Sequence, residues 1–445
     1  MKKTVFGAAL LAASIAPLSA QGADDKELAE IRAQIAAMKQ DYEARLQQLE
    51  QRLQQAQAAA NVTPPVSVAP IAPAAPAASN AFNPNISLVL GGTLANLSQD
   101  PAQYRLQGFL PAGGEAGPGK RGFNLGESEL TFAANVDPTF NGQLTFSLSG
   151  EDSVGVEEAF VQSGALANGA NLRLGRFLSS IGYLNSQHAH AWDFVDAPLA
   201  YQAFFGGQYK PDGVQFKWLA PSDSFIELGA ELGSGAAFPG SARGKNGVGS
   251  AAVFAHMGDD VGTSGSWRAG LSYLHTGSQQ RAFDNGGQVD AFSGDSSIWM
   301  ADAIYKWAPN GNATRENFKL QAEYLHRRES GTLSHDAASS QFASTQAGWY
   351  LQGVYQFTPA WRAGARYERL DSGNASFGLA GGAALYPGLA PYAPARASLM
   401  LDYSPSEFSR FRLQWARDQS RPDAIDNQLF LQYIMSLGTH AAHAF

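Results

Sequence analysis

The chain has 445 residues, with 31 Lys and Arg against 39 Asp and Glu, 47 Gly, 26 Phe and no Cys. Without cysteine, neither a disulfide scaffold nor a thiolate metal site can form. The net charge is 31 − 39 = −8, and no basic run follows the first residues. A nucleic-acid partner held by phosphate contacts is therefore not expected.

Residues 1–20 have the pattern of a secretory signal peptide. Lys2 and Lys3 precede an apolar stretch at 5–15, and Ala20 offers a small residue for cleavage, with Ala23 as a second option. Further along, no uninterrupted apolar stretch reaches the roughly 18 residues that a membrane-spanning helix needs. A mature chain that crosses a membrane must therefore do so with β-strands.

Two short regions precede the main domain. Residues 24–57 lack Gly and Pro, and Leu28, Ile31, Ile35 and Met38 follow steps of three and four residues, which predicts a coiled coil; a solvated single helix is the alternative. Residues 58–84 are rich in Ala and Pro and almost free of charge, which favours an extended spacer.

Residues 85–445 show alternating segments of about ten residues separated by turn-rich segments, which predicts an all-β fold. In one such segment Phe318, Leu320 and Tyr324 alternate with Lys319 and Glu323. A soluble β-sandwich and a transmembrane antiparallel β-barrel both alternate in this way.

The connections and the aromatic residues favour the barrel. Short connections near 137–140, 220–223, 358–359 and 404–407 alternate with long ones near 98–122, 179–211, 277–297 and 371–395. Trp, Tyr and Phe cluster near strand ends, as in the aromatic girdles of membrane barrels. About sixteen strands fit into this region, which is typical of a porin-size barrel.

The C-terminus and one internal motif carry a resemblance to a known type. The chain ends with an alternating strand at 429–437 and a terminal Phe445, which resembles the assembly signal of bacterial outer-membrane proteins. The architecture resembles outer-membrane porins, nearest to the phosphate-selective porins and to the sugar porins with an N-terminal periplasmic coiled coil. The motif most similar to that group consists of Leu174, Gly175, Arg176 and Phe177, followed by Ile181, Gly182, Tyr183 and Asn185.

This resemblance implies a location in the outer membrane of a Gram-negative bacterium, in contact with lipid and lipopolysaccharide. It also implies a homotrimer, assembly by the barrel-assembly machinery through the C-terminal strand, a coiled coil in the periplasm, and a third loop folded into the pore. The expected lumen carries both signs of charge, which departs from the phosphate-selective pattern.

Charged residues on the polar face of the strands are candidates for pore selectivity, with arginines on the later strands and carboxylates on the earlier ones. The alternative is that these charges only keep a water-filled wall wet. The selectivity candidates outside the third loop are Arg268, Lys319, Arg362, Arg366, Arg410 and Arg412.

The third long loop concentrates His188, His190, Trp192, Asp193 and Asp196, and we expect it to narrow the pore. In an extended chain His188 and His190 point the same way, so a Zn²⁺ or Cu²⁺ site with Asp193 or Asp196 is chemically feasible. The alternative is a constriction loop whose His and Asp side chains tie it to the wall. Apart from such an ion, no cofactor is predicted.

No catalytic motif stands out, and we predict no enzyme. The run from Gly114 to Arg121 has Arg where a P-loop has Ser or Thr. The sequence therefore predicts a channel for passive diffusion of small hydrophilic solutes or ions. Two alternatives remain: a metal uptake or receptor protein that uses the His- and Asp-rich loop, and an envelope tether with a peptidoglycan-facing coiled coil. An energy-coupled receptor needs a large N-terminal plug domain, and only about 60 residues lie between the signal and the first expected strand.

Overall fold

The computed structural model describes residues 84–113, 116–148, 153–164, 166–241, 246–336, 338–378 and 381–438. They belong to one compact unit. The regions predicted as signal peptide and coiled coil, the linker apart from its last residue, and Phe445 lie outside the described residues.

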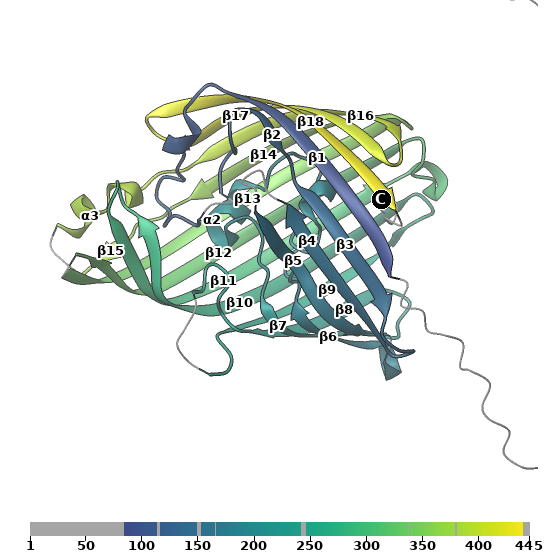
Figure 1. The fold of residues 1–445 in the computed structure, drawn as a ribbon, viewed down its shortest axis with the longest axis horizontal. Coiled ribbons are helices and arrows are strands. Elements are labelled where there is room, and N and C mark those ends of the chain that lie inside the picture. The colour runs from purple at the N-terminus through teal and green to yellow at the C-terminus, as the bar shows by residue number, and fades with distance from the viewer. Residues whose placement is uncertain are drawn as a thin grey trace, which may run out of the picture. The chain divides into compact units, whose positions relative to one another are not determined.

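The unit is a single antiparallel sheet (Figure 1). Its first strands are β1 (Asn85–Leu97), β2 (Gly122–Leu125), β3 (Ser128–Asn135), β4 (Phe140–Leu148), β5 (Val154–Ser163), β6 (Ala170–Arg176), β7 (Asp212–Leu219), β8 (Phe225–Gly233) and β9 (Ser250–Val261). The others are β10 (Gly265–Asp284), β11 (Val289–Trp307), β12 (Asn317–His335), β13 (Ala338–Thr358), β14 (Trp361–Asp371), β15 (Ser376–Phe377), β16 (Ala395–Ser406), β17 (Ser409–Arg421) and β18 (Ala424–Gly438).

The sheet closes on itself because β1 pairs with β18 on one side and with β2 and β3 on the other. β2 and β3 pair with successive parts of β1 and so form one interrupted strand, and β15 is a two-residue addition beside β13. Of the 18 strands, 18 − 2 = 16 therefore build the wall in the described part of the chain. The predicted barrel of about sixteen strands is confirmed.

Helical segments are few among the described residues: α2 (Leu199–Phe205), α3 (Gly382–Leu385), and the 3₁₀ turns η1 (Pro101–Gln103), η2 (Ala167–Gly169), η3 (Ala189–Ala191), η4 (Pro309–Gly311) and η5 (Pro387–Leu389). None of the described helices has the length and apolar character needed to cross a membrane.

The alternation of each strand sets the two faces of the wall. On β12, Leu320 and Tyr324 are exposed outside the barrel, whereas Gln321 and Glu323 are buried inside. Outward aromatic residues form two bands: on β11, Trp299 and Trp307 are eight residues apart, which at about 3.3 Å per residue is roughly 26 Å along the strand. This spacing fits an apolar band about 25 Å tall on a lipid-facing wall.

The strands β10 to β13 are longer than the other strands, and their length shows that one predicted loop is wrong. The expected loop at 277–297 is instead a hairpin, in which β10 and β11 continue to residues 284 and 289. Figure 1 shows β10 to β13 reaching toward the end where α3 and β15 lie, which we call the outer end. The inner end is the one where Ser87 of β1 pairs with Gly438 of β18. Residues 277–297 are rich in Gly, Ser and Asp because this part of the hairpin extends beyond the apolar band, so its outward face needs no apolar side chains.

Candidate functional site

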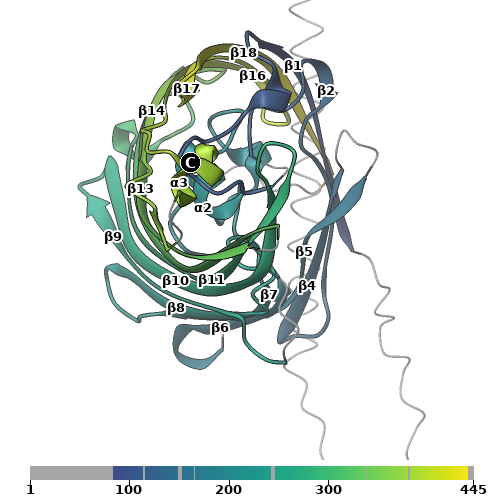
Figure 2. The ribbon, with the colours of Figure 1, turned by 90° about the vertical axis from the view of Figure 1, so that its left-hand side faces the viewer.

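The loop between β6 and β7, residues 177–211, lies inside the barrel, and we call it L3. Figure 2 looks along the barrel and shows α2 of this loop within the ring of strands. Pro198 precedes α2 and Gly206 ends it in the left-handed conformation, at φ 67°. All seven residues of α2 are buried, and they pack with inward-facing apolar side chains such as Leu274, Leu325 and Tyr350. L3 therefore fills one side of the lumen.

Charged side chains of the wall complement both ends of α2. The Glu368 carboxylate accepts a hydrogen bond from the Leu199 N–H at the first turn. At the other end Arg327 donates to the carbonyl of Ala203, 3.1 Å away, and its guanidinium lies 4.8 Å from the centre of the Phe204 ring. A carboxylate at the N-terminus and a guanidinium at the C-terminus are the charges that the helix dipole favours.

Asp193 anchors L3 to the wall of β12 to β14. Its carboxylate lies 2.6 Å from Lys319 Nζ, 3.0 Å from Arg362 Nη1 and 3.1 Å from the Gln352 amide. Burial alone would raise the pKa of Asp193, but the charges of Lys319 and Arg362 outweigh it and hold this pKa well below its usual range. Asp193 is therefore an anion in the middle of the barrel.

Asp196 makes a second anchor three residues later. It accepts from Arg366 Nη2 at 2.6 Å and from the Gln414 amide at 3.1 Å, and it lies 2.5 Å from Arg396 Nη1. Burial opposes ionisation here too, and Arg396 and Arg366 lower the pKa of Asp196. The carboxylates of L3 therefore neutralise much of the cationic wall.

The other predicted residues of this wall are also engaged. Arg412 donates to Asp402 at 2.8 Å, and Arg410 donates to the carbonyl of His190. Trp192 is buried and donates through its indole N–H to the carbonyl of Gln187. Arg410 thus ties L3 to the wall, whereas Arg412 pairs within the wall and Trp192 within the loop.

Glu323 of β12 is a hub for L3. Its carboxylate accepts hydrogen bonds from the hydroxyls of Tyr201 and Tyr350, each at 2.7 Å, and from the backbone N–H of Leu184 at 2.8 Å. Gly182 is required beside it, because this residue has φ 68° and a Cβ there would come within 2.6 Å of Glu323 Oε2.

On the opposite wall L3 is held by its histidines. His188 Nδ1 lies 3.0 Å from Glu129 Oε2, and its Nε2 lies 3.1 Å from Glu158 Oε2. His190 Nδ1 lies 3.1 Å from Glu129 Oε1. Burial lowers the pKa of His188, but its contacts with Glu129 and Glu158 outweigh this effect and raise the pKa well above its usual value.

The expected metal-ligand set differs from the arrangement in the structure. Asp193 and Asp196 lie among Lys and Arg side chains and not beside the histidines, because the cationic wall of β12 to β16 attracts them. The carboxylate that joins His188 and His190 is Glu129. Glu129 precedes Leu130 in an alternating segment, so its strand pattern places it on the polar face, but sequence spacing cannot show that a loop about 60 residues later returns to it.

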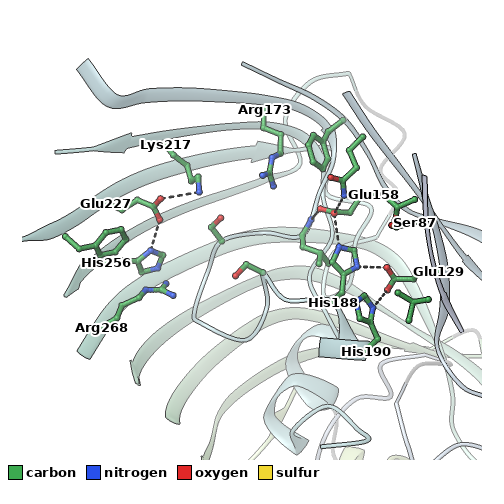
Figure 3. Close-up of a pocket in the computed structure, with 18 residues that line it drawn as sticks. Ser87, Glu129, Glu158, Arg173, His188, His190, Lys217, Glu227, His256 and Arg268 are labelled. Atoms are coloured by element: carbon green, nitrogen blue, oxygen red, sulfur yellow. Dashed lines mark hydrogen bonds and ion pairs between the residues drawn. The ribbon is translucent and has the colours of Figure 1, made fainter. Parts of the chain in front are cut away.

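A cavity of about 510 Å³ remains between L3 and the earlier strands, and Figure 3 shows its lining. Its lining includes both acidic and basic side chains: Glu129, Glu158, Glu227, Arg173, Lys217, Arg268, His188, His190 and His256. Arg268, predicted as a selectivity residue, faces this cavity and donates to the carbonyl of Gly182 at 3.2 Å. Lys217 pairs with Glu227 at 3.2 Å, and His256 lies 3.1 Å from the same carboxylate.

Sequence reasoning missed Glu158, Glu323 and Glu368 as loop anchors. All three are on the inward face of their strands, but nothing in their local sequence marks them as partners of L3. For α2 a signal does exist, because Pro198 precedes a Gly-free run of helix-compatible residues and Gly206 follows it.

A closed antiparallel wall with an apolar exterior and a charged interior crossed by a loop is the fold of a transmembrane β-barrel with the architecture of porins. The fold is similar to the outer-membrane channel DcaP of Acinetobacter baumannii, with a TM-score of 0.50 at 14% identity, covering 80% of this chain and 97% of that one. It is equally similar to in-vitro folded OmpT, an outer-membrane protein of Vibrio cholerae in its trimer form, with a TM-score of 0.50 at 11% identity, covering 80% of this chain and 99% of that one.

No protein-family model matches the chain. An uncharacterised protein of Aquifex aeolicus (strain VF5) is 31% identical over 396 residues, which cover 82% of this chain and 80% of that protein. The chain belongs to the same family as this Aquifex protein.

Proposed function

We propose that the protein is a channel for passive diffusion of small hydrophilic solutes or ions across the outer membrane, and that L3 sets the width of the passage. The observation that carries this proposal is the cavity of about 510 Å³ between L3 and the wall. Its volume falls within the range of small-molecule sites, and its lining is charged on several sides.

The placement of L3 supports a passage on one side of the barrel only. L3 packs tightly against the strands from β9 to β14 through α2 and an apolar cluster. Toward β3 to β8 it instead borders the cavity, where Arg173, Lys217 and Glu227 face the open space. Solutes that cross the barrel would therefore pass along the earlier strands.

We further propose that the functional unit is a homotrimer. OmpT of Vibrio cholerae, whose barrel has a similar fold, has a trimer form, and this likeness supports the same assembly here. The rival proposal of an energy-coupled receptor is less well supported, because in the described residues the segments inside the lumen are loops of the barrel itself and leave a cavity beside them.

The test is single-channel conductance of the purified protein in planar bilayers, with a chelator in the buffer to remove transition metals. Stepwise openings in groups of three are the expected result for a trimeric channel. A correctly folded barrel that gives no conductance would overturn the proposal and favour a tether. A matched control is heat-denatured protein from the same preparation, which should give no discrete openings.

A further inference from the structure

Two histidines of L3 and one glutamate of β3 meet at the edge of the cavity (Figure 3). One ligand atom from each of Glu129, His188 and His190 lies within 4.8 Å of the other two. The two imidazole rings are stacked, with centroids 5.5 Å apart and planes at 29°. Two imidazoles and one carboxylate are a donor set that Zn²⁺ takes when a fourth position stays open.

Two carboxylates face the ring of His188, and either a second ring proton or a metal ion can balance them. Carboxylate oxygens of Glu129 and Glu158 lie 3.0 and 3.1 Å from its two ring nitrogens. A neutral imidazole carries one proton, so it can donate to only one of these carboxylates. Among the described residues, Nδ1 is shielded from solvent and makes no well-aligned hydrogen bond.

A metal ion at Nδ1 satisfies all of these groups together. Nε2–H of His188 then donates to Glu158, and Glu129 and His190 share the ion with the Nδ1 lone pair. A carboxylate that accepts the second ring N–H of a ligating histidine is the usual way in which proteins orient such ligands. Glu129 and Glu158 are only 3% and 5% exposed, so a divalent ion would bring a positive charge to two nearly buried carboxyl groups.

We propose that Glu129, His188 and His190 form a binding site for Zn²⁺ or a similar divalent transition-metal ion, with Glu158 as the residue that positions His188. Tetrahedral ligands at about 2.0–2.1 Å from zinc lie roughly 3.3 Å apart. The three donor atoms lie within 4.8 Å of one another, so each distance between two of them must shorten by about 1.5 Å at most when the ion binds. The ion ties L3 to β3 at the edge of the cavity. The inference rests on the proposed function only in placing the ion beside the path of solutes.

The test is calorimetric titration of the full-length protein, folded in detergent and stripped with a chelator, with zinc chloride alone. One Zn²⁺ per chain is expected, and His190→Gln should weaken binding at least tenfold, with Glu158→Gln weakening it about 10- to 100-fold. Glu129→Gln is a second ligand variant on another element. Each variant is first checked for the heat-dependent gel mobility of a folded barrel.

Two controls separate this site from other histidines. His256→Gln removes a cavity histidine that also lies 3.1 Å from a glutamate, and it should leave zinc affinity unchanged. His440→Gln with His443→Gln removes a pair outside the described residues and should also have no effect. Absence of zinc binding, or affinity that depends on the control histidines and not on His190 and Glu129, would overturn the proposal.

Failure of the site and failure of the channel give different results. If the protein conducts in the presence of chelator but does not bind zinc, the metal-site proposal fails and the channel proposal stands. If the protein binds zinc through Glu129 and His190 but never conducts, the metal-site proposal stands and the channel proposal fails.

Discussion

Replacement of Asp196 by Asn tests whether L3 is held by its carboxylates. Asp196 lies between Arg366 and Arg396, whose side chains are 2% and 0% exposed. Removal of one partner from a buried ion pair costs about 3–5 kcal/mol, because it leaves a buried charge without compensation. Both arginines keep Glu368, at 2.9 and 2.8 Å, so we expect the lower end of this range, about 3 kcal/mol.

This magnitude can be converted into an expected change in the channel. About 3 kcal/mol shifts the equilibrium between docked and released L3 by roughly 150-fold, since 1.36 kcal/mol corresponds to a factor of ten. Release of L3 widens the lumen, so Asp196→Asn should show openings of larger conductance and more frequent switching between levels in planar bilayers. The wall of the barrel should still fold, because its strand pairs do not involve Asp196.

The matched control is Asp423→Asn. Asp423 pairs with Arg105 at 2.9 Å, but the two side chains are 58% and 39% exposed, and an exposed pair contributes only about 0–1 kcal/mol. Its conductance should equal that of the unaltered chain. If Asp196→Asn behaves like Asp423→Asn, then Asp196 does not hold the loop or the loop does not limit the passage, and the reasoning fails.

Three further predictions follow from the same geometry. Lys319 and Arg362 hold the pKa of Asp193 well below the unfolded value of about 3.9, so its contribution to the docking of L3 is complete above that pH and declines progressively as the pH falls toward the lower folded pKa. Conductance should stay constant down to about pH 4 and rise gradually below it, and Asp193→Asn should lack this change. Arg173→Gln removes a cation from the cavity and should shift the reversal potential in a KCl gradient toward cation selectivity, more than Lys319→Gln does, because Lys319 is neutralised by Asp193. Tyr201→Phe removes the hydrogen bond to the buried Glu323 carboxylate and should lower the free energy of unfolding by about 1–3 kcal/mol. The temperature of the heat-dependent gel shift should fall, and an unchanged temperature would contradict the role of this contact.

The wall of the barrel could be predicted because its pattern is local. Lipid on one side and water on the other impose a two-residue period on each strand, so Leu320 and Lys319 reveal their faces without any knowledge of their neighbours. The same rule failed at 277–297. There the hairpin extends beyond the apolar band, so its outward-facing positions need not be apolar and the alternation of apolar and polar residues disappears. A long strand then has the composition of a loop.

The interior of L3 could not be predicted in this way because its contacts are distant in sequence. The sequence identifies His188 and Asp193 as a concentration of polar groups in one loop. It does not show that they turn to opposite walls, His188 to Glu129 and Asp193 to Lys319. These pairings are 59 and 126 residues apart, and they depend on the closure of the barrel and on the depth at which α2 packs.

The way in which L3 is anchored changes which charges can act on a solute. Arg362, Arg366 and Arg412 carry the charge expected of a selectivity wall, but each is within 3.0 Å of a carboxylate from L3 or from a neighbouring strand. A charge that is paired at such a distance contributes little field to the open lumen. On the other side of L3, Arg173 and Arg268 line the cavity itself. We therefore expect the selectivity of the proposed passage to depend on the side chains that line the cavity more than on the paired arginines of the later strands.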